Sequence, residues 1–244
     1  RPQVPVDKTP AIAVAFVGGF RCRKEMMMFR RALLICGLLM APGFSFAEVA
    51  PSSIAADTTW TKSQSPILIN ETLTIGVGAT LTIESGITLT LADKVSIRVQ
   101  GGLKARGSES DPIRVEGGQN DSGQARWGSI TFKEGSTDAS FSQLDDYENG
   151  SIVEWVIFDH GTQALRLEGT SPYVHRCTFQ NNYSGEAGGP AITATKGSRA
   201  RIRNNTFADN YADGFSAWGG AVLVESSDVI LQDNTFERNK SYYG

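Results

Sequence analysis

The sequence contains few cysteines and no long apolar run. Three cysteines occur in 244 residues, and Cys22 and Cys36 lie within the first 47. Once a leader of that length is removed, Cys177 stands alone and no internal disulfide can form. The apolar run at residues 32–40 is too short to span a bilayer. We therefore expect a mature chain with no disulfide and no transmembrane helix.

Several sequence signatures of chemistry are also missing. The chain has no phosphate-binding glycine loop, no zinc-ligand spacing and no nucleophile elbow. Residues 48–244 keep 16 of the 23 Lys+Arg and 24 of the 26 Asp+Glu, which gives this part a net charge of −8. That balance argues against nucleic acid or an anionic membrane as a partner.

The first 47 residues look like a leader. Residues 1–25 begin with arginine and have no clear pattern, which indicates translated upstream sequence or, alternatively, a disordered extension. Residues 26–47 have the pattern of a secretory signal peptide, with Arg30 and Arg31 before a short apolar core and a small residue, Ala47, before the cleavage point. A lipoprotein signal is disfavoured because Ile35 precedes Cys36. We therefore predict export, to the medium or to the outer membrane and cell surface.

The part after the leader is built from repeats. Segments 174–182, 202–210 and 231–239 align on an apolar residue, then Asn or Cys, Thr-Phe and a closing Asn, and segment 153–161 fits more loosely. Their phenylalanines follow one another at intervals of 21, 28 and 29 residues. Repetition at this spacing is typical of a solenoid. We expect the ordered domain at residues 60–244, after a polar leader at residues 48–59.

Each repeat predicts strands and no helix. Segments such as 165–168, 192–195 and 222–225 alternate apolar and polar residues, and glycines precede them. Strands that recur without a crossover helix suit a coil of parallel strands, in which each coil pairs its backbone with the next. The sequence therefore predicts an all-β parallel β-helix. Because the repeats stop at Gly244 where another coil is expected, we also expect the domain to be truncated at that end.

Stacking of coils predicts columns of like side chains about 4.8 Å apart. An interior column of rings is expected from Phe158, Phe179, Phe207 and Phe236. Asn205 and Asn234 are expected to stack at a tight turn, because Asn tolerates unusual backbone angles there and caps buried backbone groups. Cys177 falls in the asparagine column, where a small core residue is favoured over a reactive thiol.

These motifs resemble known families. The repeats are similar to those of the right-handed parallel β-helices of the pectin-lyase-like superfamily. The Phe-x-x-Asn segments and residues 219–222 also resemble the repeats of polymorphic outer-membrane proteins, although Pro190 departs from that motif. The resemblance covers roughly residues 60–244 and implies right-handed coils.

Two functions are compatible with such a domain. The first is an exported scaffold for surface binding or adhesion, and an autotransporter passenger is the more specific version of it. Its partners would be a polysaccharide or a host or cell-surface protein. We expect a monomer. The alternative is a polysaccharide lyase or glycoside hydrolase whose catalytic coils lie beyond residue 244. We expect no catalytic residues in this part, because the outward positions Arg166, Glu168, Thr193, Thr195, Leu223 and Glu225 form no carboxylate cluster.

Other polar groups give weaker signals. Asp145, Asp146 and Glu148 could bind Ca²⁺, but their spacing matches no calcium loop, so an acidic surface loop is favoured and no cofactor is expected. The pair Asp159–His160 has no nucleophile nearby in sequence. Outward groups on the other strands (Glu154, His175, Arg203, Gln232) are interpreted as a solvated face. The loop aromatics, which could stack on a ligand or cover the coil, are Tyr183, Tyr211, Phe215 and Trp218.

Overall fold

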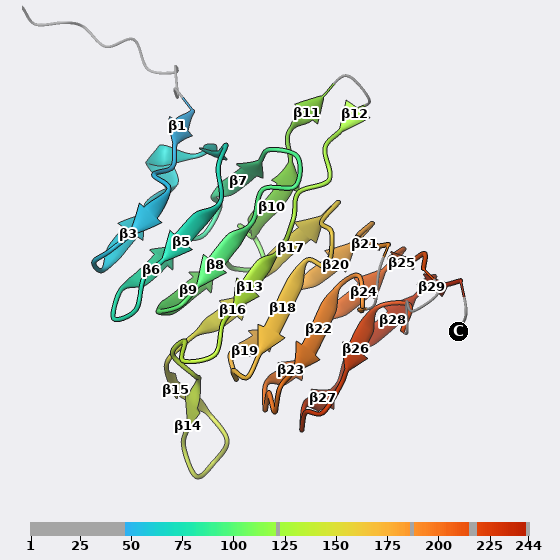
Figure 1. The fold of residues 1–244 in the computed structure, drawn as a ribbon. Coiled ribbons are helices and arrows are strands. Elements are labelled where there is room, and N and C mark those ends of the chain that lie inside the picture. The colour runs from blue at the N-terminus through green and yellow to red at the C-terminus, as the bar shows by residue number, and fades with distance from the viewer. Residues whose placement is uncertain (1–46, 121–122, 186–187, 215–218, 243–244) are drawn as a thin grey trace, which may run out of the picture. The chain divides into compact units, whose positions relative to one another are not determined.

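A computed structural model describes residues 47–120, 123–185, 188–214 and 219–242. Within these residues the one helical element is the short 3₁₀ turn η1 (Lys62–Gln64), and all other regular structure is strand. Figure 1 shows the strands following one another as stacked coils from the blue to the red end. In these segments no helix has the length and apolarity that crossing a membrane requires. The predicted extension and signal peptide lie outside the described residues, apart from Ala47.

Three parallel sheets, here named A, B and C, form the walls of the domain. Sheet A contains β1 (Glu48–Val49), β4 (Ile67–Ile69), β7 (Thr88–Leu91), β10 (Ile113–Gly117), β17 (Val156–Asp159), β20 (Thr178–Gln180), β24 (Thr206–Ala208) and β28 (Thr235–Glu237). Sheet B contains β2 (Ser53–Ile54), β5 (Leu73–Ile75), β8 (Ile97–Val99), β13 (Ile130–Phe132), β18 (Leu165–Glu168), β22 (Ile192–Thr195) and β26 (Val222–Val224). Sheet C contains β3 (Thr58–Trp60), β6 (Thr80–Ile83), β9 (Gly102–Arg106), β16 (Ile152–Glu154), β19 (Tyr173–His175), β23 (Arg201–Arg203) and β27 (Ile230–Gln232).

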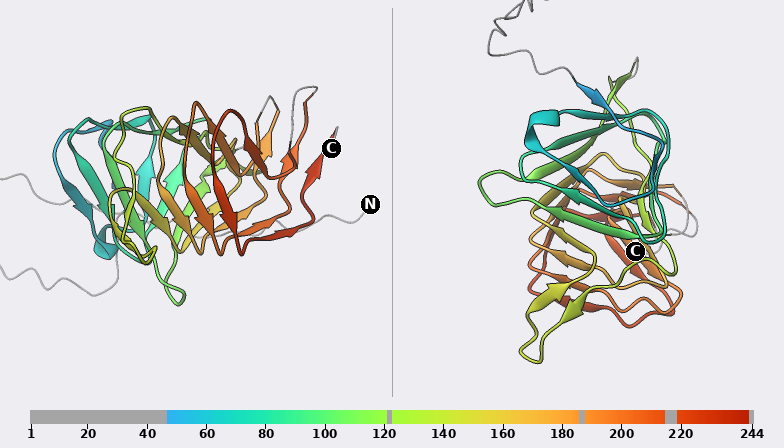
Figure 2. Two further views of the ribbon diagram at one scale, coloured as in Figure 1. Left: turned by 90° about the horizontal axis from the view of Figure 1, so that it is seen from below. Right: turned by 90° about the vertical axis from the view of Figure 1, so that its left-hand side faces the viewer.

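Each coil contributes one strand to each wall, in the order A, B, C. The views in Figure 2 show the coils stacked along one axis and the walls enclosing the interior. This is a right-handed parallel β-helix: the repeats predicted the parallel coils, and the family resemblance implied their hand. Period-2 alternation explains the geometry, because one side chain of each pair enters the core and the other faces outward.

Further strands extend this plan in two ways. A fourth, three-stranded parallel sheet joins successive late coils and consists of β21 (Tyr183–Ser184), β25 (Tyr211–Ala212) and β29 (Lys240–Ser241). Two antiparallel pairs interrupt the coils: β11 (Gln119–Asn120) with β12 (Gly123–Gln124), and β14 (Ser140–Phe141) with β15 (Tyr147–Asn149). The β14–β15 hairpin leaves the body between β13 and β16 (Figure 1).

The β-helix begins before the predicted boundary at residue 60. Residues 48–59 were expected to be a polar leader, but they contain β1, β2 and most of β3, which pair in parallel with β4, β5 and β6. Ile54 is buried, and Trp60 belongs to the core of this first coil. The boundary was misplaced because a coil needs few inward apolar residues, so a largely polar segment can still form one.

The predicted column of rings forms the core of the late coils. Parallel register pairs Phe158 with Phe179, Phe179 with Phe207 and Phe207 with Phe236. The ring centroids are 4.7, 5.1 and 4.7 Å apart, and the planes differ by 9 to 12°. The first three rings are fully buried, and Phe236 is 51% exposed on the last coil that the structure describes.

The predicted asparagine column is also present, with one correction. Asn205 Oδ1 accepts the backbone N–H of Cys177 at 2.8 Å, and Asn234 Oδ1 accepts that of Asn205 at 2.9 Å. The residues with positive φ are those just before the column, Asn204 (+56°) and Asp233 (+54°), not Asn205 and Asn234 themselves. The column asparagines cap backbone groups with their side chains. The left-handed backbone angle falls on the residue before each of them, which can be Asn or Asp.

A second asparagine column was not recognised from the sequence. Asn182, Asn210 and Asn239 occupy the next corner of successive coils, where each Oδ1 accepts the backbone N–H of the coil before. Their Nδ2 groups donate to the carbonyls of Phe158, Phe179 and Phe207. The closing Asn of every repeat is therefore a structural residue.

Candidate functional site

The outer face of sheet B carries ordered polar side chains. Along one column, parallel register aligns Arg98, Thr131, Arg166, Thr193 and Leu223. In the neighbouring column Glu168 pairs with Thr195. These positions face outward because the residues between them, such as Leu165 and Leu167, are fully buried in the core.

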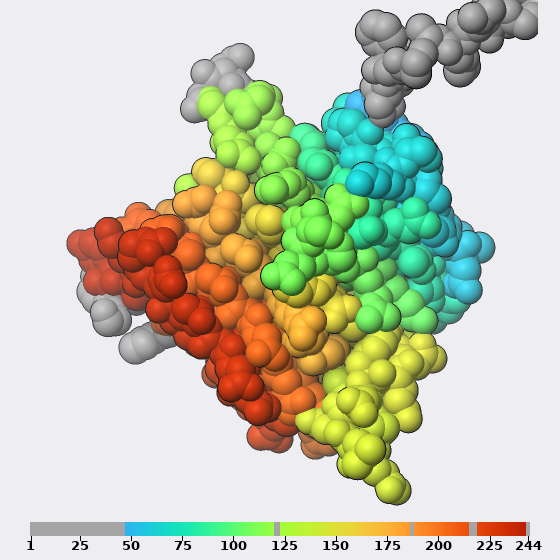
Figure 3. Space-filling view, turned by 180° about the vertical axis from the view of Figure 1, so that it is seen from behind, coloured from blue at the N-terminus to red at the C-terminus, as the bar shows by residue number. Residues whose placement is uncertain are grey.

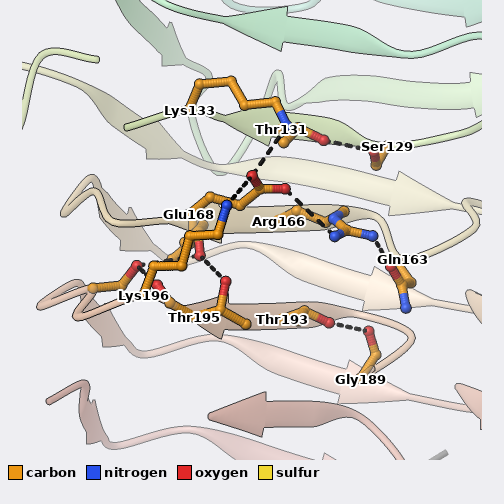
Figure 4. A network of polar contacts seen from close by, with 12 residues as sticks. Ser129, Thr131, Lys133, Gln163, Arg166, Glu168, Gly189, Thr193, Thr195 and Lys196 are labelled. Carbon is orange, nitrogen blue, oxygen red and sulfur yellow. Dashed lines mark hydrogen bonds and ion pairs between the residues drawn. The ribbon is translucent and has the colours of Figure 1, made fainter. Parts of the chain in front are cut away.

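Glu168 is the centre of a network of charges on this face (Figure 4). Its carboxylate lies 3.0 Å from Lys133 Nζ, 3.3 Å from Lys196 Nζ and 3.4 Å from Arg166 Nη2. Arg166 Nη1 also donates to Gln163 Oε1 at 2.6 Å. Burial tends to raise the pKa of Glu168, but hydrogen bonds and charges from Lys133 and Lys196 outweigh it and lower that pKa. Glu168 is therefore an ionised anchor that orders three cations from three coils.

Two open hollows flank this network and share Arg166. The first has a volume of about 470 Å³ and is lined by Gly128, Ser129, Thr162, Gln163, Arg166, Tyr183, Ser184 and Gly185. The second, of about 420 Å³, is lined by Arg166, Glu168, Thr195, Lys196, Glu225 and Ser226. Together they make a polar surface that runs across several coils. Such a surface offers hydroxyl, amide and cationic groups to a ligand.

Tyrosines border the first hollow. Tyr183 on β21 and Tyr211 on β25 are paired in register, with ring centroids 6.1 Å apart. The guanidinium of Arg126 lies 5.0 Å from the Tyr183 centroid, and Tyr211 is 37% exposed. The structure thus brings Tyr183 to the polar hollow and sets Tyr211 beside it. The other two predicted aromatics, Phe215 and Trp218, lie outside the described residues.

The carboxylates on this face are poorly placed for acid–base catalysis. Glu225 lies two coils beyond Glu168, since Thr195 occupies the coil between them. Two coil steps correspond to roughly 10 Å at the backbone. Glycosidase carboxyl pairs are about 5 to 9 Å apart, and Glu168 is held by two lysines. The arrangement is better suited to binding than to general acid–base work.

The pair Asp159–His160 forms at a corner of sheet A. His160 Nδ1 lies 2.7 Å from Asp159 Oδ1, which also accepts Asn181 Nδ2 at 2.9 Å. His160 has a positive φ of +58°. Among the described residues, the side-chain hydrogen bonds of this pair involve each other and Asn181 but no serine, threonine or cysteine, so no nucleophile is in place for it to activate.

The acidic group at residues 145–148 is placed on the β14–β15 hairpin. Asp145 forms ion pairs with Arg201 and Arg203 of β23. Within the part of the chain that the structure describes, no group of three or more His, Cys, Asp or Glu side chains could hold a metal ion. Asp145 thus pairs with two arginines of sheet C.

The polar groups on sheet C are linked to one another, whereas the sequence was interpreted as a solvated face. Glu154 accepts Arg106 Nη2 at 2.9 Å and lies 3.0 Å from His175 Nδ1. The side chains of Glu154 and His175 are only 14% and 13% exposed. A hydrogen bond with His175 is the largest contribution to the lowered pKa of Glu154. Gln232, on the last described coil, is exposed.

Cys177 is buried, as expected of a core residue. Burial raises the pKa of its thiol to about 12, so the thiolate that a nucleophile requires is scarce at neutral pH. Lys133, Lys196 and Gln163 were missed from the sequence. They stand at strand ends and turns, outside the alternating positions, and only the coil register shows that they meet Glu168.

The class of protein follows from this geometry: a right-handed parallel β-helix with a polar, cation-rich outer wall. Residues 134–243 match the model of the family described as the right handed beta helix region. This match and the stacked parallel strands agree with the pectin-lyase-like superfamily. No curated protein and no solved structure matches the chain.

Proposed function

We propose that this chain is an exported β-helix scaffold that binds a polysaccharide along the outer face of sheet B. The observation that carries the proposal is the pair of open hollows joined at Arg166 and bordered by Tyr183. A sugar ring can stack on a tyrosine while its hydroxyl groups bond to neighbouring polar side chains. The coil register repeats outward groups at each step, which suits a ligand with repeating units.

The charge of this face favours an acidic sugar. Lys133, Arg166 and Lys196 surround one buried carboxylate, and Arg126 stands over Tyr183. This local excess of cations contrasts with the net charge of −8 over residues 48–244. Uronate or sulfate groups would be attracted to such a surface and would complete its hydrogen bonds.

Export and adhesion are part of the proposal and rest on sequence features. The signal-peptide pattern of residues 26–47 supports export, and the similarity of the repeats to polymorphic outer-membrane proteins supports use at a cell surface. Expression of the chain with a terminal epitope tag, followed by cell fractionation, tests this part. Tagged protein that keeps its leader and stays in the cytoplasm would contradict it.

Binding of defined polysaccharides to the full chain tests the ligand. We would immobilise the protein and measure retention of neutral, uronate-containing and sulfated glycans. Arg166→Ala and Tyr183→Ala should each weaken retention of the acidic glycans by roughly five- to tenfold. The matched control is Arg114→Ala, an exposed arginine on sheet A. Equal retention by all four proteins, or no retention of any glycan, would contradict the site.

An enzyme is the second candidate, because Lys133, once it has lost its own proton, could abstract a proton from an acidic sugar held beside Glu168. The same glycans should be incubated with the full chain and assayed for new reducing ends and for unsaturated products. Product formation that depends on Lys133 would replace the binding proposal by a lyase. Intact glycans that are retained support the scaffold.

A further inference from the structure

An acidic hairpin leans on the outer face of sheet C. Residues 139–150 contain three carboxylates, Asp145, Asp146 and Glu148, and no lysine or arginine. Figure 3 shows this hairpin as the yellow projection at the lower right. The strands beside it carry Lys104 and Arg106 on β9 and Arg201 and Arg203 on β23. The carboxylate of Glu154 on β16 pairs with Arg106, so the arginines of β23 are the cations that the hairpin contacts. Hairpin and wall are therefore complementary in charge.

Asp145 joins two arginines that stand on the same side of one strand. Arg201 and Arg203 are separated by one residue on β23, so both side chains face outward. The Asp145 carboxylate forms an ion pair with each of them, at 2.5 Å in the case of Arg203 Nη1. Burial, and then the charge of Arg203, lower the pKa of Arg201. Two guanidinium groups held this close require an anion, which the hairpin supplies.

Aromatic contacts complete the hairpin's attachment. Phe141 packs edge-on against Tyr173 at 5.2 Å, and the Arg201 guanidinium lies 3.6 Å from the Phe141 ring centroid. Tyr147 also stacks on Tyr173, with ring centroids 6.0 Å apart. Tyrosine and arginine together are the residues that most often dominate the binding energy of protein interfaces. The wall thus holds the hairpin as it would hold a separate peptide.

The contact between the hairpin and sheet C is incomplete. A hollow of about 380 Å³ lies between hairpin and wall, lined among others by Arg106, Tyr147, Glu154, Tyr173 and His175. Arg203 Nε is buried and has no hydrogen-bond acceptor in the described segments. The hairpin tip adds no burial, since Leu144 is 85% exposed. A cover attached in this way can be displaced by a ligand that fills the hollow better.

We propose that the outer face of sheet C is a docking surface for an acidic peptide segment that carries an aromatic residue near its carboxylate, and that the chain's own β14–β15 hairpin occupies it as an autoinhibitory cover. This surface is separate from the polysaccharide site on sheet B, so neither proposal rests on the other.

Peptide binding to a variant with a shortened hairpin tests the proposal. In this variant Asn-Gly replaces residues 141–148 of the full chain. The probe is a fluorescent peptide with the sequence of residues 139–150, and binding is followed by anisotropy. The shortened variant should bind at least roughly tenfold more tightly than the native chain, whose surface is occupied. Adding Arg203→Ala to it should weaken binding roughly fivefold, whereas Arg114→Ala should have no effect. If the shortened variant folds but shows no detectable binding of the peptide, the proposal is wrong.

A second measurement does not depend on the shortened variant. In the full chain, Asp145→Asn should speed hydrogen exchange of the hairpin amides roughly fivefold, because it removes both ion pairs. Asp146→Asn is the matched control, because Asp146 lies on the same hairpin and bonds to Ser142 through its backbone. Equal exchange in the two variants would show that the arginine pair does not hold the hairpin, and the proposal would fail.

Discussion

Replacing Phe207 by alanine should destabilise the β-helix far more than the same change at Phe236. Phe207 is fully buried between two rings, with centroids 5.1 and 4.7 Å away. Its removal leaves a closed cavity and should cost about 3 to 5 kcal/mol, ring contacts included. Phe236 is 51% exposed and stacks on Phe207 alone. The Phe236→Ala change therefore removes about half as much buried area and only one ring contact, and it should cost about 1 to 2 kcal/mol.

Urea unfolding of the full chain, followed by circular dichroism, measures this difference. From these ranges we expect the two variants to differ by about 1 to 4 kcal/mol in the free energy of unfolding, with slopes equal to that of the native chain. Phe207→Leu is the volume control and should cost less than Phe207→Ala. Equal losses at Phe207 and Phe236 would refute the view that the rings form one core column whose energy follows burial.

Three further outcomes are expected. Asn210→Ala should lower the free energy of unfolding by about 3 kcal/mol, because it leaves the buried N–H of Asn182 and the carbonyl of Phe179 unpaired; a loss under about 1 kcal/mol in urea titrations would contradict this. The lowered pKa of Glu168 means that its contribution to stability is complete above the ordinary pKa of about 4.3 and disappears as the pH falls through the folded-state value. The stability gap between the native chain and Glu168→Gln should therefore close on acidification, and a gap that stays constant to low pH would argue against the lysine network. Cys177, with its raised pKa of about 12, should resist iodoacetamide at pH ~8 until urea is added, as read by peptide mass spectrometry; rapid labelling of the folded chain would place this thiol at the surface.

The repeating features of the fold were predictable because they depend on position within a coil. Phe179, Phe207 and Phe236 occupy the same place in each repeat. Residues that align between repeats in the sequence are therefore neighbours in the folded chain. The asparagine at Asn205 and Asn234 was predictable for the same reason. In both cases the neighbour in space is the equivalent residue one repeat later.

The charged sites were not predictable in this way. Asp145 and Arg203 are 58 residues apart and meet because the β14–β15 hairpin folds back over later coils. Lys133 reaches Glu168 from a turn, at a separation of 35 residues, which differs from the spacing of the repeats. Insertions change the length of each coil. Contacts made by turns and hairpins can therefore be predicted only once the register of the folded chain is known.

The separation of the two outer faces is a consequence of the repeat. Inward residues such as Phe207 build one continuous core, so the outward positions are free to carry polar and charged side chains. On sheet B these positions gather cations around a carboxylate of the same wall, Glu168. On sheet C the arginine pair Arg201 and Arg203 is instead contacted by Asp145 of a separate hairpin. The first face keeps open hollows beside a surplus of cations, with Lys133, Arg166 and Lys196 around Glu168. On the second face the arginine pair is covered by the hairpin that carries Asp145. That difference is the physical reason to propose sheet B as an open binding surface and sheet C as a surface from which a ligand must displace the β14–β15 hairpin.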